Sequence, residues 1–208
     1  MDTPGTDCYL CPRLAQFRHD NREAYPDWFN APVPSFGGLG AELLILGLAP
    51  GLKGANRTGR PFTGDYAGDL LYQTLLKFGF VRGVYDSRPD DGLEMVNTRI
   101  ANAVRCVPPQ NKPVGAEIKA CAPFLDSELT AMANLKVIVA LGTIAHNAAI
   151  GALGERRSAW KFGHNVSHEI EGGPVVIDSY HCSRYNTNTG RLTEEMFHDV
   201  FRNVKARL

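Results

Sequence analysis

The sequence predicts an α/β protein in which helices cover both faces of a central parallel sheet of four strands. Three observations favour this three-layer αβα architecture. Short apolar runs recur along the chain, as expected for strands that are buried on both faces. Segments with helical spacing separate these runs, and four alternations of strand and helix are typical of a parallel sheet. The 208 residues, 44% hydrophobic and 21% charged, fit one domain that spans 1–208 and has a sizeable core.

The four strands are predicted from their apolar runs and from the glycines or polar residues that bound them. The first run covers residues 43–46 and ends at Gly47. The others cover residues 95–105, 136–141 and 175–180. Because parallel strands end at the same edge of a sheet, we expect the segments that follow them to form the functional site.

The helices are predicted between and after these strands. Apolar residues recur at helical spacing over residues 67–80. Residues 115–134 are expected to be helical in pieces, because Pro123 can restart a helix at its first turn. A third helix is expected over residues 143–150. The last follows Thr193, a good N-cap whose two following glutamates suit the positive end of a helix.

The N-terminal residues 1–40 are rich in proline, glycine and aromatic residues and have weak periodicity, so we expect an irregular segment that packs on the domain. The formal net charge is zero, so any site for a polyanion must be local. No apolar stretch is long enough to span a bilayer, and no signal-peptide pattern is present. We therefore expect a cytoplasmic protein whose five cysteines do not form structural disulfides.

A long polar loop, residues 47–65, leaves the first strand. It contains several glycines, three cations, one aromatic side chain and one carboxylate. A surface connection is one interpretation of such a segment. Loops of this length inside a compact domain are usually functional, and this one leaves the carboxyl end of a parallel strand.

Four cysteines form a second candidate site. Cys8 and Cys11 are separated by two residues, and Cys106 and Cys121 by fourteen. In a cytoplasmic protein this set predicts a structural four-thiolate metal site, and the spacing does not choose between zinc and an iron–sulfur cluster. The alternative is that Cys106 and Cys121 are buried apolar residues.

Three segments in this order resemble the uracil-DNA glycosylase superfamily, in particular its family 5, the UDGb type. Residues 47–65, GLAPGLKGANRTGRPFTGD, are similar to the first motif of that family. Residues 102–109 resemble its strand and cysteine segment, and residues 181–186 its second motif. The resemblance implies that Cys8, Cys11, Cys106 and Cys121 bind a structural [4Fe–4S] cluster.

The resemblance also implies roles in the removal of a base from DNA. The flipped base needs a stacking partner and donors, and the sugar, which becomes cationic, needs negative potential and a positioned water. Phe62 is expected to stack on the base, Asn102 to bind its edge, and His181 to donate to its developing charge. The remaining substrate-binding positions are backbone or wall positions of the turn: Gly47, Leu48, Ala49 and Gly51. The alternative for Phe62 is that it is a core residue. The alternative for Asn102 is that its amide only forms hydrogen bonds with the backbone of the protein.

Asp65 is the only carboxylate of the first motif and is expected to orient water, since Leu48 and Ala49 are unable to do so. Its alternative role is the N-cap of the next helix. Gly51 replaces the bulky aromatic of thymine-excluding members, which implies a roomier pocket and a broader range of deaminated bases. Cys182 replaces the usual proline after His181, so the loop loses a rigid residue.

The expected DNA contacts are basic or polar residues of the two motifs, with a solvated loop as the alternative for the first three: Lys53, Arg57, Arg60, Ser183, Arg184, Tyr185 and Asn186. The resemblance thus implies a monomeric, monofunctional uracil-DNA glycosylase that acts in base excision repair and associates with the nucleoid when bound to DNA. It is expected to act on uracil and other deaminated bases, such as hypoxanthine or xanthine. The alternatives are an iron–sulfur nucleic-acid-binding module without activity, and a phosphate-binding enzyme that acts on small nucleotides.

Overall fold

The computed structural model describes residues 1–208 and contains a central sheet of five strands in the order β4-β1-β5-β7-β6. The four predicted strands are present and parallel. A fifth strand, β6, pairs antiparallel with β7 at one edge and was not predicted. The bounds are β1 Leu43–Gly47, β4 Thr98–Asn102, β5 Val137–Leu141, β6 Ser167–Glu169 and β7 Val175–Ser179.

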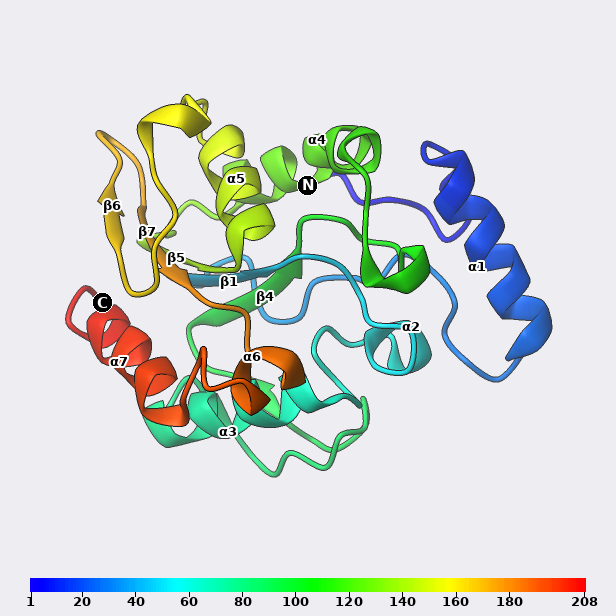
Figure 1. Cartoon of the computed structure of the whole chain (residues 1–208), viewed down its shortest axis with the longest axis horizontal. Coiled ribbons are helices and arrows are strands. Elements are labelled where there is room, and N and C mark those ends of the chain that lie inside the picture. Colours follow the sequence, from blue (N-terminus) through cyan, green and yellow to red (C-terminus); the bar gives the residue numbers. More distant parts are fainter.

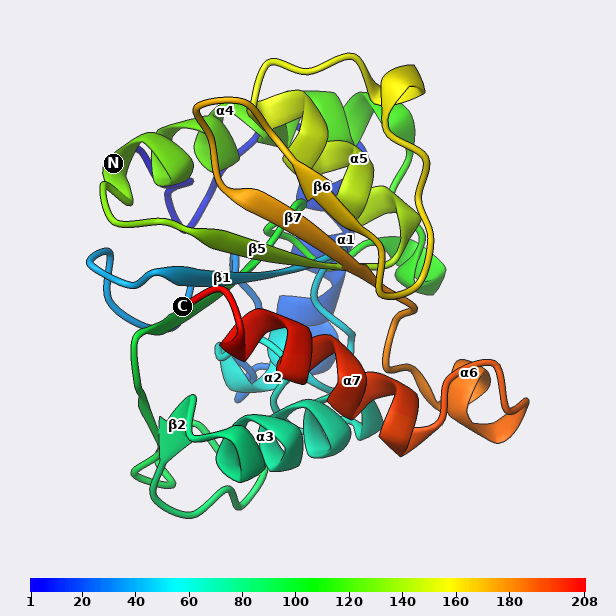
Figure 2. The same ribbon diagram turned by 90° about the vertical axis from the view of Figure 1, so that its left-hand side faces the viewer.

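Two pairs of helices cover the two faces of the sheet (Figures 1 and 2). The pairs are α3 Tyr66–Phe78 with α7 Glu194–Lys205, and α4 Gly115–Ala131 with α5 Thr143–Ala152. Alternate residues of β1 belong to two hydrophobic clusters, with Leu43 and Ile45 packed among residues of α3 and α7, and Leu44 and Leu46 among residues of α4 and α5. The predicted three-layer αβα architecture is therefore confirmed.

The second strand is shorter than predicted. β4 begins at Thr98, because Glu94–Met95 form a separate strand, β3, that pairs antiparallel with β2, Val81–Arg82. Beyond Asn102 the chain leaves the ladder, although the N–H groups of Ala103 and Val104 still donate to the carbonyls of Gly47 and Leu48. This leaves Asn102 at the carboxyl end of β4, beside the end of β1.

The N-terminal segment contains a helix, α1 Pro12–Ala24, so the expectation of an irregular segment was wrong for these residues. Proline occupies the first turn, where its missing N–H costs no hydrogen bond. The helix buries only Leu14, Arg18 and Asn21. Because two of these three residues are polar, the sequence has no apolar stripe that would have indicated a helix.

The helix predicted in pieces over residues 115–134 is one helix, α4, with Pro123 in its interior. Proline removes one intrahelical hydrogen bond, to the carbonyl four residues earlier. The helix continues because both halves are anchored: the N–H of Val114 donates to Glu117 Oε2 at 2.8 Å, and Leu125 and Glu128 are buried beyond the proline. Tertiary contacts therefore outweigh the local cost.

Short elements complete the fold. They are α2 Ala55–Thr58, α6 Arg184–Asn188 and two single turns, Pro109–Asn111 and Arg157–Ala159. No helix of the protein is long and apolar enough to cross a bilayer. The short elements α2 and α6 matter for function, because each carries residues of a predicted motif.

Thr193 caps α7 as predicted, since its side-chain oxygen accepts a hydrogen bond from the N–H of Met196 at 3.2 Å. We expect Thr193→Ala to reduce the free energy of unfolding by about 1 kcal/mol, which corresponds to a fall of about 2–4 °C in the melting temperature. Thermal unfolding followed by circular dichroism measures this change. Thr6→Ala, at an exposed position, is the control, and an unchanged melting temperature for Thr193→Ala would contradict the capping role.

Candidate active site

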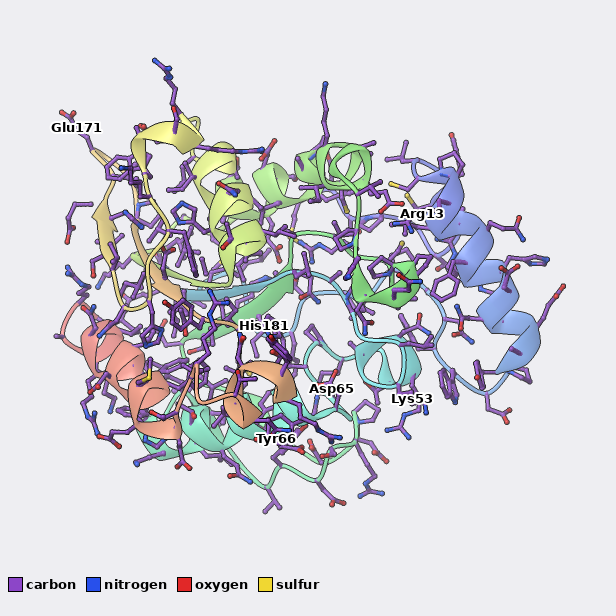
Figure 3. All side chains as sticks on the ribbon, viewed as in Figure 1. Arg13, Lys53, Asp65, Tyr66, Glu171 and His181 are labelled. Atoms are coloured by element: carbon purple, nitrogen blue, oxygen red, sulfur yellow. The ribbon has the colours of Figure 1, made fainter.

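A pocket of about 400 Å³ opens at the carboxyl ends of β1 and β4 and beside the segment that follows β7. Residues from both motifs meet there, together with Asn102. Figure 3 shows Asp65, Tyr66 and His181 around this region, with Lys53 toward α2. The lining residues are Leu48, Ala49, Pro50, Gly51, Ala55, Phe62, Asp65, Tyr66, Ala67, Asn102, Asn111, His181, Ser183 and Arg184.

Asn102 is the polar residue at the end of β4. It is 3% exposed, and its Oδ1 atom has no hydrogen-bond partner. It pairs in register with Gly47, where an added Cβ would clash with Asn102 Oδ1 and lie 2.6 Å from Phe62 Cζ. Gly47 itself does not line the pocket. It allows the Asn102 amide and the Phe62 ring to approach the end of β1.

Phe62 lies both in the core and at the pocket. Its side chain is 7% exposed and belongs to the larger hydrophobic cluster, so the alternative of a core residue holds in part. Its backbone has φ 52°, a left-handed conformation that is uncommon for a bulky residue. Its ring centroid lies 6.0 Å from that of His181, with the planes 28° apart. The ring therefore forms a wall beside the histidine.

His181 follows β7 and lines the pocket with a neutral ring. Its Nδ1 atom is buried and has no hydrogen-bond partner. Burial lowers the pKa of His181 to about 4, because the protein interior disfavours the imidazolium. A neutral imidazole at pH 7 can donate one hydrogen bond without bringing a charge into the pocket.

Asp65 is the pocket's carboxylate and is also the N-cap of α3. Its Oδ1 accepts a hydrogen bond from the N–H of Gly68 at 3.2 Å, so the predicted capping is present. An added Cβ at Gly51 would lie 2.9 Å from Oδ2, and one at Gly54 would clash with the same atom. Burial, with the neighbouring charge of Asp69, raises the pKa of Asp65 above its ordinary value.

The turn after β1 offers backbone donors to the pocket. The N–H groups of Ala49 and Gly51 donate to no carbonyl or side chain of the protein. A ligand with carbonyl oxygens is therefore a suitable partner for this turn.

Two polar lining residues were not among the predicted site residues. Tyr66 is the first residue of α3, and its ring lies 5.3 Å from the guanidinium carbon of Arg184. Asn111 ends the single turn at Pro109–Asn111 and has φ 55°. The position of Tyr66 next to Asp65 was a usable signal, whereas no sequence pattern places Asn111 at this pocket.

The three cations of the first motif separate into two groups. Lys53 and Arg57 are exposed and form no ion pair, as a contact with phosphate requires. Arg60 is 5% exposed and its guanidinium makes two 2.7 Å hydrogen bonds to the buried carboxylate of Asp91. The interpretation of Arg60 as a DNA contact was therefore wrong, because its charge is neutralised inside the protein.

The residues after His181 form the short helix α6. Ser183 caps it and lines the pocket, and Arg184 lies at the mouth against Tyr66. Tyr185 is 72% exposed. The amide of Asn186 donates to the carbonyl of His181 at 2.8 Å, so this side chain holds the histidine loop.

Cys182 does not loosen the loop in place of proline. It is fully buried in the core, and its Sγ donates to the carbonyl of Ala67 at 3.4 Å. Burial raises the pKa of Cys182 to about 12, so the thiol is not a reactive group. Packing and the α6 cap thus replace the rigidity that proline would supply.

The four predicted cysteine ligands line one small cavity away from the pocket, and the two cavities share no residue. Cys8 and Cys11 precede α1, Cys106 follows β4, and Cys121 lies on α4. None forms a disulfide. Burial raises the pKa of Cys11 and of Cys106 to about 11, so metal ligation must release their protons.

Two donors point at the sulfur atoms of this cavity. Arg18 Nη1 donates to Cys106 Sγ at 3.6 Å, and the N–H of Arg105 donates to Cys121 Sγ at 3.4 Å. Arg18 is 5% exposed and its other terminal nitrogen is bonded to the carbonyl of Cys8 at 2.8 Å. A buried cation beside four thiols suits a site whose ligands are anionic.

A third polar cluster, made of His146, His168 and Asp178, lies in the core. The Asp178 carboxylate accepts from both histidines at 2.8 Å and from the N–H of Gly163 at 3.1 Å. His146 also donates to the carbonyl of Trp160 at 3.0 Å. Burial disfavours the charged form of His146, but the Asp178 carboxylate outweighs this effect and raises the pKa of His146. In the protonated ring, both nitrogens donate hydrogen bonds, one to Asp178 and one to the carbonyl of Trp160. A satisfied hydrogen-bond network accounts for this cluster.

Comparisons with known proteins agree with this arrangement. The sequence model of the Uracil DNA glycosylase superfamily matches residues 34–205. The type-5 uracil-DNA glycosylase of Thermus thermophilus is 44% identical over 206 residues, covering 96% of this chain and 93% of the relative. That of Pyrobaculum aerophilum is 39% identical, covering 96% and 88%. The type-4 uracil-DNA glycosylase of Sulfurisphaera tokodaii is 32% identical, covering 81% and 72%. The chain therefore belongs to the uracil-DNA glycosylase superfamily and to its type-5 group.

Proposed function

We propose that this protein hydrolyses the N-glycosidic bond of uracil in DNA and leaves an abasic site. One observation carries the proposal. The structure has three buried side-chain nitrogen or oxygen atoms without a hydrogen-bond partner, and two of them, Asn102 Oδ1 and His181 Nδ1, belong to residues of one pocket. Unpaired buried polar groups are costly, so a pocket that holds two is suited to a ligand with matching polar edges.

The edge of uracil matches the groups around the pocket. A flipped base enters beside the Phe62 ring, and its N3–H donates to Asn102 Oδ1 while the amide nitrogen donates to a carbonyl of the base. The N–H groups of Ala49 and Gly51 and the neutral His181 ring supply further donors. As the glycosidic bond breaks, its electron pair leaves with the base, and donors that strengthen toward the resulting anion lower the barrier.

The second half of the reaction needs a water at the sugar. The water oxygen forms the new bond to the anomeric carbon and loses a proton. We propose Asp65 as the group that orients this water, because Leu48 and Ala49 are apolar and Asp65 is the carboxylate of the pocket. Asn111 lies in the same pocket and is proposed as a second polar partner for the water.

Other deaminated bases belong to the proposal as well. Gly51 leaves space where a side chain would displace Asp65, since even a Cβ there lies 2.9 Å from Oδ2. A pocket of about 400 Å³ accommodates a purine such as hypoxanthine or xanthine. The absence of a side chain at Gly51 therefore leaves space both for larger bases and for the Asp65 carboxylate.

The DNA backbone is proposed to bind around the mouth of the pocket. Lys53 and Arg57 on the α2 side and Arg184 on α6 are exposed cations that can contact phosphates. Tyr185 projects into solvent on α6 and is proposed to fill the gap that the flipped base leaves. We propose that Ser183 and Asn186 contribute to DNA binding only indirectly, because they stabilise α6 and the loop before it rather than contact phosphates.

We propose that Cys8, Cys11, Cys106 and Cys121 bind a structural [4Fe–4S] cluster. The four thiols line one cavity, as a four-thiolate metal site requires. The resemblance to the iron–sulfur members of the superfamily favours a cluster over a single zinc ion. The donors from Arg18 and Arg105 suit sulfur atoms that carry negative charge.

Anaerobically purified protein is expected to be brown, with broad visible absorbance and about four irons per chain. Cys106→Ser should lose the colour and lower the melting temperature, because the metal links the N-terminal segment to the domain. Cys182→Ser is the matched control, since its thiol lies outside this cavity, and it should keep the colour. A colourless wild-type protein with one zinc per chain would refute the proposal.

The glycosylase proposal is tested with a uracil-containing duplex, which is treated with alkali after incubation so that abasic sites appear as strand breaks on a gel. Cleavage at the uracil position is expected, and no cleavage without alkali, because no lysine lines the pocket. Duplexes with hypoxanthine or xanthine test the wider range. Binding without cleavage, at high enzyme concentration, would instead favour a nucleic-acid-binding module.

The remaining proposals concern the whole molecule. We propose that residues 1–208 form a single domain, which contains both the pocket and the cysteine cavity, and that the protein acts as a monomer. Its substrate would place it with the chromosomal DNA, that is, in the cytoplasm and at the nucleoid when bound.

A further inference from the structure

His164 lies outside the pocket, beside the segment that leads to His181. Its Nδ1 atom accepts a hydrogen bond from the N–H of Tyr180 at 3.2 Å, and its Nε2 donates to the carbonyl of Met196 at 3.2 Å. The ring also stacks on the Tyr180 ring, with centroids 5.0 Å and planes 20° apart. One histidine thus connects the loop before β6, the segment after β7 and the start of α7.

These two hydrogen bonds fix the protonation state of the ring. The N–H of Tyr180 is a donor, so Nδ1 must carry a lone pair, and the carbonyl of Met196 is an acceptor, so Nε2 must carry the proton. Only the neutral tautomer satisfies both. A second proton on Nδ1 would place two N–H groups against each other and break the bond to Tyr180.

The bond to Tyr180 fixes the backbone where the sheet no longer does. β7 ends at Ser179, and the segment from Tyr180 to Ser183 has no ladder partner. Downstream of His181 the loop is held by the Asn186 amide and by the Cys182 thiol. Upstream, the Tyr180 N–H belongs to the residue directly before His181, and His164 is its acceptor.

We propose that His164 is a positioning residue, which holds the peptide before His181 and so aims the His181 ring into the pocket. This inference rests on the proposed function, in which His181 donates to the departing base. His164 touches neither base nor sugar and acts through the backbone. Protonation of His164 then releases this anchor, so the neutral ring is the active state.

Burial and the charges around His164 determine the pH at which the ring is protonated and the hydrogen bond to Tyr180 is lost. Burial lowers the pKa of His164, while the carboxylate of Asp199 on α7 acts in the opposite direction. Asp199 is itself paired with Arg202. The guanidinium of Arg191 lies 4.6 Å from the centroid of the Tyr180 ring. The folded pKa is below the ordinary value, so the anchor is present at neutral pH and is lost as the pH falls through that pKa.

Two substitutions separate the two hydrogen bonds. His164→Asn places an amide oxygen near the position of Nδ1 and keeps an acceptor for Tyr180. His164→Gln places an amide nitrogen near the position of Nε2 and keeps the donor to Met196 but not that acceptor. His19→Gln, at an exposed site on α1, is the control.

Single-turnover excision of uracil from a duplex is measured for these variants of the full-length protein between pH 5 and 8. We expect His164→Asn to stay within about twofold of the wild type at pH 7.5 and His164→Gln to fall about tenfold. The wild-type rate should fall toward pH 5 more steeply than the rate of His164→Asn, because an amide does not titrate. His19→Gln should match the wild type throughout.

Equal rates for the Asn and Gln variants, or the same acid profile for the wild type and His164→Asn, would overturn the proposal. Amide hydrogen exchange at Tyr180 tests the anchor without any turnover: exchange should be faster in His164→Gln than in His164→Asn. If the wild type excises no uracil while exchange behaves in this way, the proposed function fails and the anchor stands. If exchange is the same in both variants, the anchor itself is absent.

Discussion

Replacing Asn102 with alanine is expected to slow the excision of uracil by about 100- to 1,000-fold. The loss corresponds to about 2.7–4 kcal/mol of transition-state stabilisation, the usual cost of removing one donor that meets developing charge, here the amide nitrogen of Asn102. Asn102 is 3% exposed at the carboxyl end of β4, and its amide oxygen has no partner within the protein. Its polar atoms are therefore free for a ligand and are held in place by the sheet.

Two measurements separate recognition from structure. Single-turnover excision reports the transition state, and the dissociation constant for DNA with an abasic site reports binding without the base. Asn102→Ala should reduce the first much more than the second, because abasic DNA presents nothing to the amide. Asn134→Ala, at an exposed asparagine, is the control. Equal losses in both measurements would mean that Asn102 only supports the fold.

The fold was largely predictable because its strands are short apolar runs buried on both faces. Such runs predict three of the parallel strands, over residues 43–46, 136–141 and 175–180. The alternation of strands and helices then predicts the three layers. β6 has three residues, Ser167 to Glu169, and lies at an edge, so no apolar run marks it. α1 escaped prediction because its buried face is partly polar.

Residues of the site were predictable where they belong to a sequence motif. They were not predictable where their role depends on a partner that is distant in the sequence. Asn102, Phe62, Asp65 and His181 line one pocket, and they come from the three segments that carry the resemblance. Arg60 looked like its neighbours Lys53 and Arg57, but its partner Asp91 is 31 residues away in the sequence. The charge pattern of a loop does not reveal which cations the fold will bury.

Asp65→Asn is expected to slow single-turnover excision by about 10- to 1,000-fold, or about 1.4–4 kcal/mol, with little change in the melting temperature. Asparagine is as good an N-cap as aspartate, so the hydrogen bond from Gly68 to the side chain should persist. The substitution therefore removes the negative charge from the pocket and leaves the start of α3 in place. A cationic sugar and a water that must lose a proton both depend on that charge.

The pH dependence gives an independent test of this role. Burial raises the pKa of Asp65, so the folded state disfavours the ionised form, and the protonation of Asp65 on acidification does not destabilise the fold. Excision, which needs the carboxylate, should fall as the pH decreases through this raised pKa, above the range of an ordinary aspartate. Burial lowers the pKa of His181 to about 4, so its ring is neutral at pH 7 and the imidazole donor is present there.

The Asn variant should lack the acid limb that belongs to Asp65, and its rate should vary less with pH than that of the wild type. Asp69→Asn, also in the first turn of α3, is the control for charge, since it removes a carboxylate near the pocket but not within it, and its rate at pH 7.5 should match that of the wild type. Its acid limb should remain but move to lower pH, because the charge of Asp69 helps to raise the pKa of Asp65. If Asp65→Asn excises uracil at the wild-type rate, Asp65 is only a cap. The chemical step then depends on His181, Asn102 and the backbone donors of the turn after β1, and Asn111 becomes the remaining polar side chain that can orient the water.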